Sequence, residues 1–164
     1  QAKDFLALYK KRYPKVFSFL EMQERLALSR GYVETILGRR RRFDFDVNGL
    51  GRLLGKDPLE IDLEIARRGG LEAQQLRAAA NAPIQGSSAD IIKVAMVQLQ
   101  EKLINNALQA NLLLQVHDEL VLEVEPDAII EVEKLVVETM ENSISLSVPL
   151  KVDTGFGKNW MDSK

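Results

Sequence analysis

The chain has 164 residues, of which 46% are hydrophobic and 28% are charged, and its formal net charge at pH 7 is −2. These values predict a globular chain with one ordinary core, and the lack of cysteine excludes disulfides, thiolate metal sites and thiol nucleophiles. No apolar run approaches the roughly 20 residues that span a bilayer. The charge balance is not that of a strongly basic DNA-binding domain, so a role with nucleic acid must rest on local clusters.

The first stretch of the chain is predicted to form two helices and a small hairpin. Apolar residues recur at helical spacing from Asp4 to about Leu28, and Pro14 interrupts this pattern because its ring does not fit a helix interior. Residues 31–37 are rich in strand-favouring side chains, and Gly38 supplies a turn before a basic exit from the hairpin.

The middle of the chain is predicted to hold three more helices. Turn-favouring residues precede a short helix expected over 58–68, and two further helices are expected at about 71–80 and 88–106. Ser87 or Ser88 is the expected N-cap of the last of them, because a serine hydroxyl accepts hydrogen bonds from the unpaired backbone N–H groups at a helix start.

The last third is predicted to contain a hairpin, a helix and a strand. Strands at 111–116 and 120–125 flank a polar tip, a helix follows at about 126–142, and alternating apolar residues over 148–152 favour a final strand. Helices segregated from a few hairpin-linked strands indicate an α+β fold, with the helices packed on a small antiparallel sheet.

The polar tip His117-Asp118-Glu119 interrupts two apolar strands. Adjacent carboxylates at a tight turn repel each other unless a cation, a hydrogen-bond donor or solvent offsets the repulsion. Mg²⁺ would do so, because it takes oxygen ligands and keeps waters and substrate phosphates in its other positions. An ordinary solvated turn explains the pattern as well and is the commoner case. His117 is the only histidine and no nucleophile-elbow pattern is present, so a serine hydrolase triad is not expected.

Two other groups of residues are candidates for contact with nucleic acid. Arg77, Asn81 and Gln85 are spaced by four and would align on one helix face if Pro83 did not intervene. Amide side chains both donate and accept hydrogen bonds, as the reading of minor-groove base edges requires. The run of arginines over 39–42 suits phosphate oxygens, which a guanidinium group binds with two hydrogen bonds. An ordinary solvated surface explains either group too.

Four segments together resemble family A DNA polymerases, in the family's order, within a resemblance that runs from about residue 2 to residue 162. The segments are 31–35 (GYVET) with 38–41 (GRRR), 77–86 (RAAANAPIQG) with 89–93 (ADIIK), 115–121 (QVHDELV), and 155–160 (GFGKNW). The third resembles motif C, the hairpin that supplies a catalytic aspartate from the palm. The resemblance implies a template-directed DNA polymerase, which transfers a nucleotide from dNTP to a primer 3′ end by a two-Mg²⁺ mechanism.

Carried over position by position, the resemblance implies a role for each residue of the tip. Asp118 would be a catalytic ligand of Mg²⁺, the implied cofactor, and Glu119 a nearby auxiliary acid. His117 would lie near the primer terminus.

The same resemblance implies a surface for DNA. It places Arg77, Asn81 and Gln85 against the minor groove and backbone of primer–template DNA, and Arg39 and Arg40 near the DNA backbone. The implied partners are primer–template DNA and, in the full-length enzyme, dNTP, with no membrane and with a monomer as the expected state. The implied location is the bacterial cytoplasm or an organelle of bacterial descent.

The chain is expected to be only the carboxy-terminal part of that enzyme, and to be inactive alone. Residues 1–86 would be the distal fingers and connecting helices, with an insertion near 43–75, and residues 87–164 would be the palm. Neither the string Asp-Tyr-Ser-x-Ile-Glu, which holds the family's other catalytic aspartate, nor the nucleotide-gripping fingers helix occurs here. Leu76 stands where the family commonly has a glutamate. A non-catalytic nucleic-acid-binding module and a structural domain are the alternative interpretations.

Overall fold

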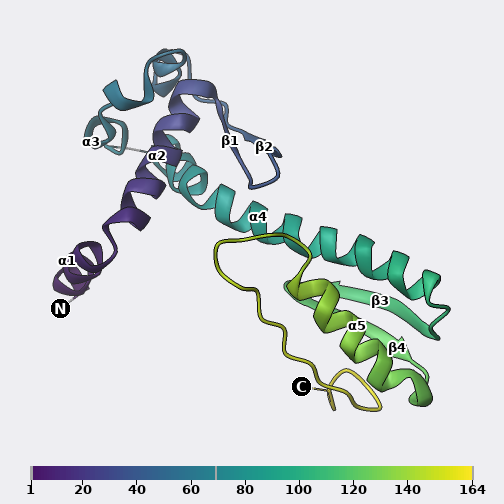
Figure 1. Cartoon of the computed structure of the whole chain (residues 1–164). Helices are drawn as coiled ribbons and strands as arrows, with labels where there is room; N and C mark the ends of the chain where they lie inside the picture. Colours follow the sequence, from purple (N-terminus) through teal and green to yellow (C-terminus); the bar gives the residue numbers. More distant parts are fainter. Residues whose placement is uncertain (1, 69, 164) are drawn as a thin grey trace. The chain divides into compact units, whose positions relative to one another are not determined.

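The computed structural model describes residues 2–68 and 70–163, with side chains from residue 4 onward in the first of these ranges. The chain forms two compact units, Gln1–Ser87 and Ser88–Lys164. Figure 1 labels their helices and strands, and each unit has its own apolar clusters. Among the described residues, no helix is both long enough and apolar enough to cross a bilayer.

Two helices open the first unit, and Pro14 separates them as the sequence predicts. Helix α1 covers Ala2–Arg12 and α2 covers Pro14–Arg30, with the proline at the first helical position, where its missing N–H would have no partner in any case. Gly31 ends α2 in the left-handed region with φ of 73°, and its N–H donates to the Ala27 carbonyl over 2.9 Å. Glycine is the residue that adopts this conformation without a Cβ penalty.

The predicted first hairpin is present, but its strands are shorter than expected. Strand β1 (Tyr32–Glu34) pairs antiparallel with β2 (Arg40–Arg42), so the arginine run is itself the second strand rather than a basic exit. The turn begins earlier than predicted because the Gly38 N–H donates to the Thr35 carbonyl over 2.9 Å, with φ of 78° at the glycine. Thr35 to Leu37 therefore belong to the turn.

The single helix predicted over 58–68 is wrong. Three short pieces occupy the region after the hairpin: 3-10 helices η1 (Leu50–Leu53) and η2 (Pro58–Glu60), and the four-residue helix α3 (Leu63–Ala66). The side chains of Asp57 and Asp62 each accept hydrogen bonds from backbone N–H groups two or three residues on. Each aspartate thus starts a new turn, which breaks the stretch that would otherwise be one helix.

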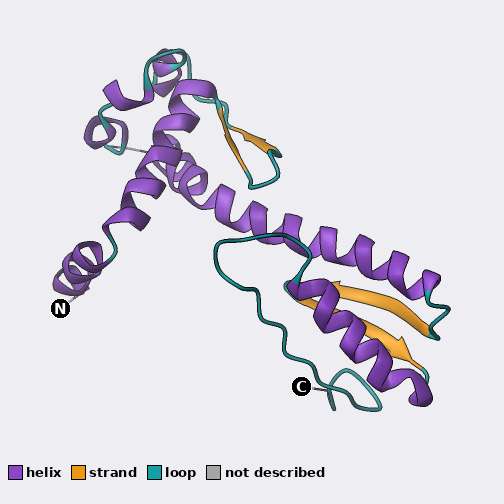
Figure 2. Cartoon of the chain, viewed as in Figure 1, coloured by secondary structure: helices purple, strands orange, loops and turns teal. Residues whose placement is uncertain are grey.

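The two helices predicted at 71–80 and 88–106 are one helix, α4, which covers Gly70–Asn105 with Pro83 inside it (Figure 2). The N-cap expected at Ser87 or Ser88 is therefore wrong, since both serines lie in the helix interior. An interior proline removes one helical hydrogen bond and destabilises an isolated helix by about 3 kcal/mol. Pro83 is buried together with its neighbour Ala82, so tertiary packing supports the helix through this point.

Two apolar clusters form the core of the first unit. One joins α2, the 3-10 segments and the start of α4, and consists of Leu28, Leu50, Ile61, Leu63, Ala66 and Leu76. The other packs the β1–β2 hairpin on the alanine-rich face of α4, and consists of Ala27, Val33, Phe43, Ala79 and Ala82. Leu76 is fully buried, which explains an apolar residue at this position, because a glutamate there would place a charge in the core.

The second unit confirms the predicted hairpin and the helix after it. Strand β3 (Ala110–Val116) pairs antiparallel with β4 (Glu119–Val124), and a 3-10 turn η3 (Pro126–Ala128) leads into α5 (Ile129–Glu141). Leu99 and Leu103 of α4 pack with Val132 and Val136 of α5, and apolar residues of β4 cover this cluster. The β3–β4 hairpin therefore packs on helices α4 and α5. The α+β fold class is confirmed.

The strand predicted over 148–152 does not form in the described structure. The Val152 N–H donates to Glu141 Oε1 over 3.2 Å, so the segment is tied to a side chain of α5 rather than to a strand edge. Within the described residues β3 and β4 pair only with each other. Alternating apolar residues make a strand only when their backbone groups pair with a neighbouring strand, and residues 148–152 are not part of either described sheet.

Candidate functional site

The hairpin tip is a two-residue turn made by His117 and Asp118. Val116 and Glu119 are the last paired residues of β3 and β4, so Glu119 begins a strand instead of belonging to the loop. His117 has φ of 55°, a conformation that histidine adopts more readily than most residues. Gln115 Nε2 donates to the His117 carbonyl over 2.5 Å and braces the turn. The side chains of His117, Asp118 and Glu119 are all exposed.

The tip offers one carboxylate that is well placed to bind a cation. Within the described part of the chain, Asp118 makes no hydrogen bond or ion pair, and its side chain extends from the turn into solvent. No group of three or more His, Cys, Asp or Glu side chains among the described residues could hold a metal. Mg²⁺ usually takes one or two protein carboxylates and completes its shell with water and phosphate. Asp118 fits one such position, and further ligands must come from other groups.

Helix α4 presents Arg77, Asn81 and Gln85 on one exposed face. The expectation that Pro83 would break this alignment is wrong, because the helix continues through the proline. All three side chains are exposed, whereas Leu76, Ala79, Ala80 and Ala82 on the same stretch of helix are buried. The helix thus separates a packed alanine-rich face from a face of one guanidinium and two amides. That face can donate and accept hydrogen bonds along three turns.

The arginines of the β1–β2 hairpin differ in their contacts. Arg39 Nη2 donates to the Gly86 carbonyl over 3.0 Å, which attaches the turn to α4 next to Gln85. Arg40 Nε donates to Glu34 Oε1 over 2.8 Å, and its guanidinium lies 4.5 Å from the centre of the Tyr32 ring. The hydrogen bond that Arg40 donates to Glu34, with a smaller contribution from Tyr32, raises the pKa of Arg40.

The structure brings the predicted residues together in two groups. Arg39 and Arg40 lie on the hairpin that packs against α4, close to the helix turn that carries Gln85. His117, Asp118 and Glu119 share the second hairpin's tip. The sequence interpretation missed Glu34 as the partner of Arg40. It also missed that the turn is attached to α4 at Gly86, which accepts from Arg39, and at Ser87, which accepts from the Ile36 N–H, although a glycine inside a helix is itself a signal of close approach.

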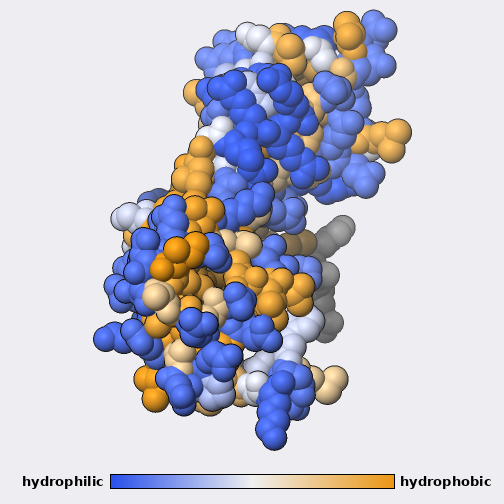
Figure 3. Space-filling model, turned by 90° about the vertical axis from the view of Figure 1, so that its right-hand side faces the viewer, coloured by the Kyte–Doolittle hydropathy of each residue, from blue (hydrophilic) through white to orange (hydrophobic). Residues whose placement is uncertain are grey.

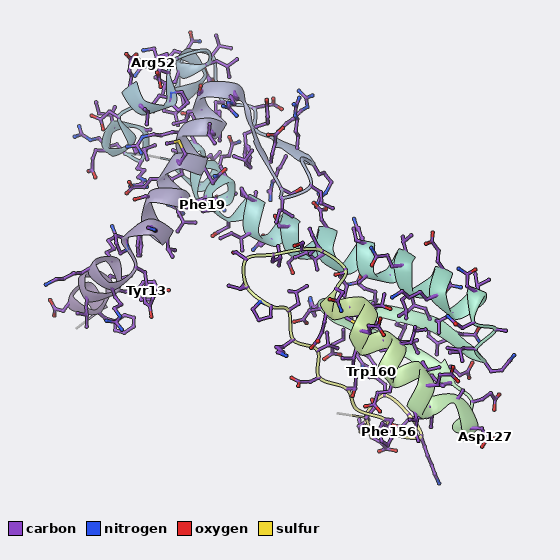
Figure 4. All side chains as sticks on the ribbon, viewed as in Figure 1. Tyr13, Phe19, Arg52, Asp127, Phe156 and Trp160 are labelled. Carbon is purple, nitrogen blue, oxygen red and sulfur yellow. The ribbon has the colours of Figure 1, made fainter. Side chains whose placement is uncertain are left out.

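Apolar side chains remain at the surface of both units. In the first unit they include Tyr13, just before α2, and Phe19, on α2, which are 47% and 43% exposed and are labelled in Figure 4. In the second they include Leu113 and Leu114 of β3 and Phe156 of the carboxy-terminal segment. Figure 3 shows such apolar areas between hydrophilic ones. Exposed apolar groups of this extent are typical of surfaces that other protein segments cover.

Comparison with known proteins gives a consistent picture. The family model described as DNA polymerase family A matches residues 1–162. DNA polymerase I of Synechocystis sp. is 47% identical over 164 residues, which are 100% of this chain and 16% of that protein. The thermostable DNA polymerase I of Thermus filiformis is 42% identical over 164 residues, again 100% of this chain, and 17% of that protein. The chain therefore spans about a sixth of the length of these relatives.

A solved structure is similar over almost the whole chain. It is the POL domain of Pol1 from M. smegmatis, in complex with DNA primer-template and dNTP. The TM-score is 0.78 at 36% sequence identity, and the match covers 99% of this chain and 25% of that one.

Proposed function

Because the chain belongs to DNA polymerase family A, we propose that it is a segment of a template-directed DNA polymerase that transfers nucleotides from dNTP to a primer 3′ end. The observation that carries the proposal is the position of Asp118. Its exposed carboxylate stands at the tip of a braced hairpin, in a chain that matches the family from residue 1 to residue 162. An ordinary solvated turn would not need this particular residue at the tip.

In this proposal the tip supplies the acidic part of the reaction centre. Asp118 would be a ligand of Mg²⁺, and Glu119 would be an auxiliary acid beside it at the start of β4. When bound, the metal ions stabilise the charge that develops on the phosphoryl oxygens and on the attacking and leaving oxygens. The chain's own contribution is to hold one carboxylate in a fixed position, through the two-residue turn and the Gln115 bond to the His117 carbonyl.

The proposed DNA surface consists of the exposed face of α4 and the basic turn, which is the β1–β2 turn with Arg39 and the adjoining Arg40 at the start of β2. Arg77, Asn81 and Gln85 contact the minor groove and backbone of primer–template DNA, and the amides suit the acceptors that both A·T and G·C pairs present there. Arg39 and Arg40 contact the DNA backbone through their guanidinium groups. His117 completes the surface near the primer terminus.

The units correspond in this proposal to parts of a larger catalytic domain. Residues 1–86 are the distal fingers with an insertion near 43–75, and residues 87–164 are the palm. The enzyme acts as a monomer. The chain alone does not polymerise, because its sequence lacks the Asp-Tyr-Ser-x-Ile-Glu string of the family's other catalytic aspartate and the nucleotide-gripping fingers helix. Other segments of the polymerase cover its exposed apolar side chains.

The test is an exchange polymerase, in which this chain replaces the matching segment of the Synechocystis relative. We expect the exchange polymerase to extend a primed template in the presence of Mg²⁺ and dNTP, and the 164-residue chain alone to extend none. The relative with its matching segment deleted is the control. An exchange polymerase that folds, as judged by circular dichroism, but extends no more primer than the deletion control would contradict the proposal.

The alternative function is a non-catalytic nucleic-acid-binding module, which the exposed Arg77–Asn81–Gln85 face favours. An amide NMR titration of the isolated chain with a primed duplex separates the two. Strong shifts at this face that persist without Mg²⁺, combined with an inactive exchange polymerase, would support the module. A well-dispersed spectrum without any shift at moderate or low salt excludes it, since duplex binding through arginines strengthens as salt falls.

A further inference from the structure

Contacts from outside the hairpin hold the β1–β2 turn on helix α4. The Ile36 backbone N–H donates a hydrogen bond to Ser87 Oγ over 2.9 Å, across 51 positions of sequence. Arg39 Nη2 donates to the Gly86 carbonyl over 3.0 Å, across 47 positions. The proposed function gives Gly86 and Ser87 no role, yet both lie directly after Gln85 on the helix.

Ser87 is prepared to accept the bond from the turn. Its hydroxyl donates to the Pro83 carbonyl over 2.5 Å, which commits the hydroxyl hydrogen to the helix. The oxygen lone pairs are then left for the Ile36 N–H, because a serine hydroxyl has one donor and two acceptor positions. An alanine at this position would remove both bonds, whereas a threonine would keep the hydroxyl.

Gly86 allows the turn and the helix to approach closely. A Cβ atom at this position would lie 2.5 Å from Thr35 Cγ2 and 3.4 Å from Arg39 Nη2. The first distance is shorter than any ordinary contact between carbon atoms, so the Thr35 side chain, or the turn that carries it, would have to shift. Glycine weakens a helix interior, and its presence here fits the need for close approach.

We propose that Ser87, together with Gly86, is a positioning residue that holds the basic turn in place for DNA. The inference rests on the proposed function, because it assigns the turn's arginines and the α4 face to one DNA-binding surface. Ser87 acts through Ile36 and touches no DNA itself. A turn that already has its bound position loses less conformational freedom on binding, so the affinity for the DNA backbone rises.

The test compares neighbouring serines in the exchange polymerase. Ser87→Ala is the test variant, Ser87→Thr the rescue, and Ser88→Ala the matched control, since Ser88 is exposed on the same helix. Fluorescence anisotropy gives the Kd for a primed duplex over a range of salt concentrations. We expect Ser87→Ala to raise Kd about three- to tenfold, the range for loss of one neutral hydrogen bond. The slope of log K against log salt should become shallower by about 0.9 for each DNA phosphate that the turn no longer binds.

Each result decides the question. Recovery of both Kd and salt slope in Ser87→Thr, with Ser88→Ala within about twofold of the parent protein, supports the positioning role. Equal Kd and slope in Ser87→Ala and Ser88→Ala would overturn it, and so would weaker binding with an unchanged slope, which is the sign of general destabilisation. Gly86→Ala is a second test variant, expected to weaken binding and flatten the slope in the same direction. Failure of the unsubstituted exchange polymerase to bind the duplex would instead contradict the proposed function itself.

Discussion

Truncation of Leu103 should destabilise the unit that carries the β3–β4 hairpin. Leu103 is 2% exposed and packs with Leu99, Val132 and Val136 beneath the β3–β4 hairpin. Leu103→Ala removes three buried carbon atoms, which at about 0.8 kcal/mol each gives about 2.4 kcal/mol. The cavity left behind raises the expected loss in the free energy of unfolding to about 3–4 kcal/mol.

Ile104 is the matched control, because it is the next residue on α4 and is 67% exposed. Ile104→Ala should change the free energy of unfolding by less than about 0.5 kcal/mol, as most surface substitutions do. The assay is urea unfolding of the 164-residue chain followed by far-ultraviolet circular dichroism, with hydrogen exchange at Val132 and Val136 as the local readout. Equal losses in the two variants would refute the packing of α4 under the hairpin.

Three further predictions concern an ion pair, a pH dependence and a strained turn. Arg67→Ala should destabilise the chain by about 2 kcal/mol in urea unfolding. The reason is that Glu24, whose side chain is 7% exposed, loses the guanidinium group that lies 2.8 Å from its carboxylate. The neighbouring Arg68→Ala is the control and should have little effect. Burial raises the pKa of Glu24 above its ordinary value of 4.5, against the opposing effect of Arg67, so the folded state holds this proton more tightly than the unfolded state. The contribution of Glu24 to stability is therefore present below pH 4.5 and lost as the pH rises through the raised pKa. In unfolding curves measured at several pH values, Glu24→Gln should reduce this loss of stability with rising pH. An unchanged loss would contradict a raised pKa at Glu24. His117→Gly should stabilise the isolated chain by about 1 kcal/mol in the same assay, since φ of 55° is strained for any residue with a Cβ, and a loss of stability would contradict this.

Local sequence signals were sufficient for the elements that depend on one residue or on one regular pattern. Pro14 at the start of a helix is such a signal, because the missing N–H of proline costs no hydrogen bond in the first turn. The β3–β4 hairpin is another, since two apolar strands flank a polar pair of turn residues. The residue types at the tip could likewise be identified from sequence, because ionisable side chains in the middle of apolar strands are unusual.

Tertiary contacts decided the elements that local signals misassigned. Pro83 predicts a helix break, but the helix continues because Ala79 and Ala82 pack against Val33 and Phe43 of the hairpin. Residues 148–152 have a strand pattern but no neighbouring strand in the described structure. Contacts between distant parts of the chain produce no regular pattern in either segment. A single sequence therefore could not predict these contacts.

The residues of the proposed DNA surface also divide into those that local patterns reveal and those that depend on tertiary contacts. Arg77, Asn81 and Gln85 could be selected by their spacing alone, once a helix was assumed. The bond from Arg39 to Gly86 crosses 47 positions and depends on the docking of the hairpin, so no local pattern predicts it.

The most direct test of the central claim measures the rate of single-turnover primer extension by the exchange polymerase when Asp118 is substituted. Asp118→Asn keeps the size of the side chain and removes its charge, and Asp127→Asn is the matched control, since Asp127 is an exposed aspartate in η3, beyond the far end of β4 (Figure 4). The account predicts that Asp118→Asn lowers the extension rate by about 100-fold or more, because several kcal/mol of charge stabilisation depends on the metal that Asp118 helps to hold. A rate within about threefold of the Asp127→Asn variant, at saturating Mg²⁺ and dNTP, would contradict the claim that this hairpin carries a catalytic metal ligand.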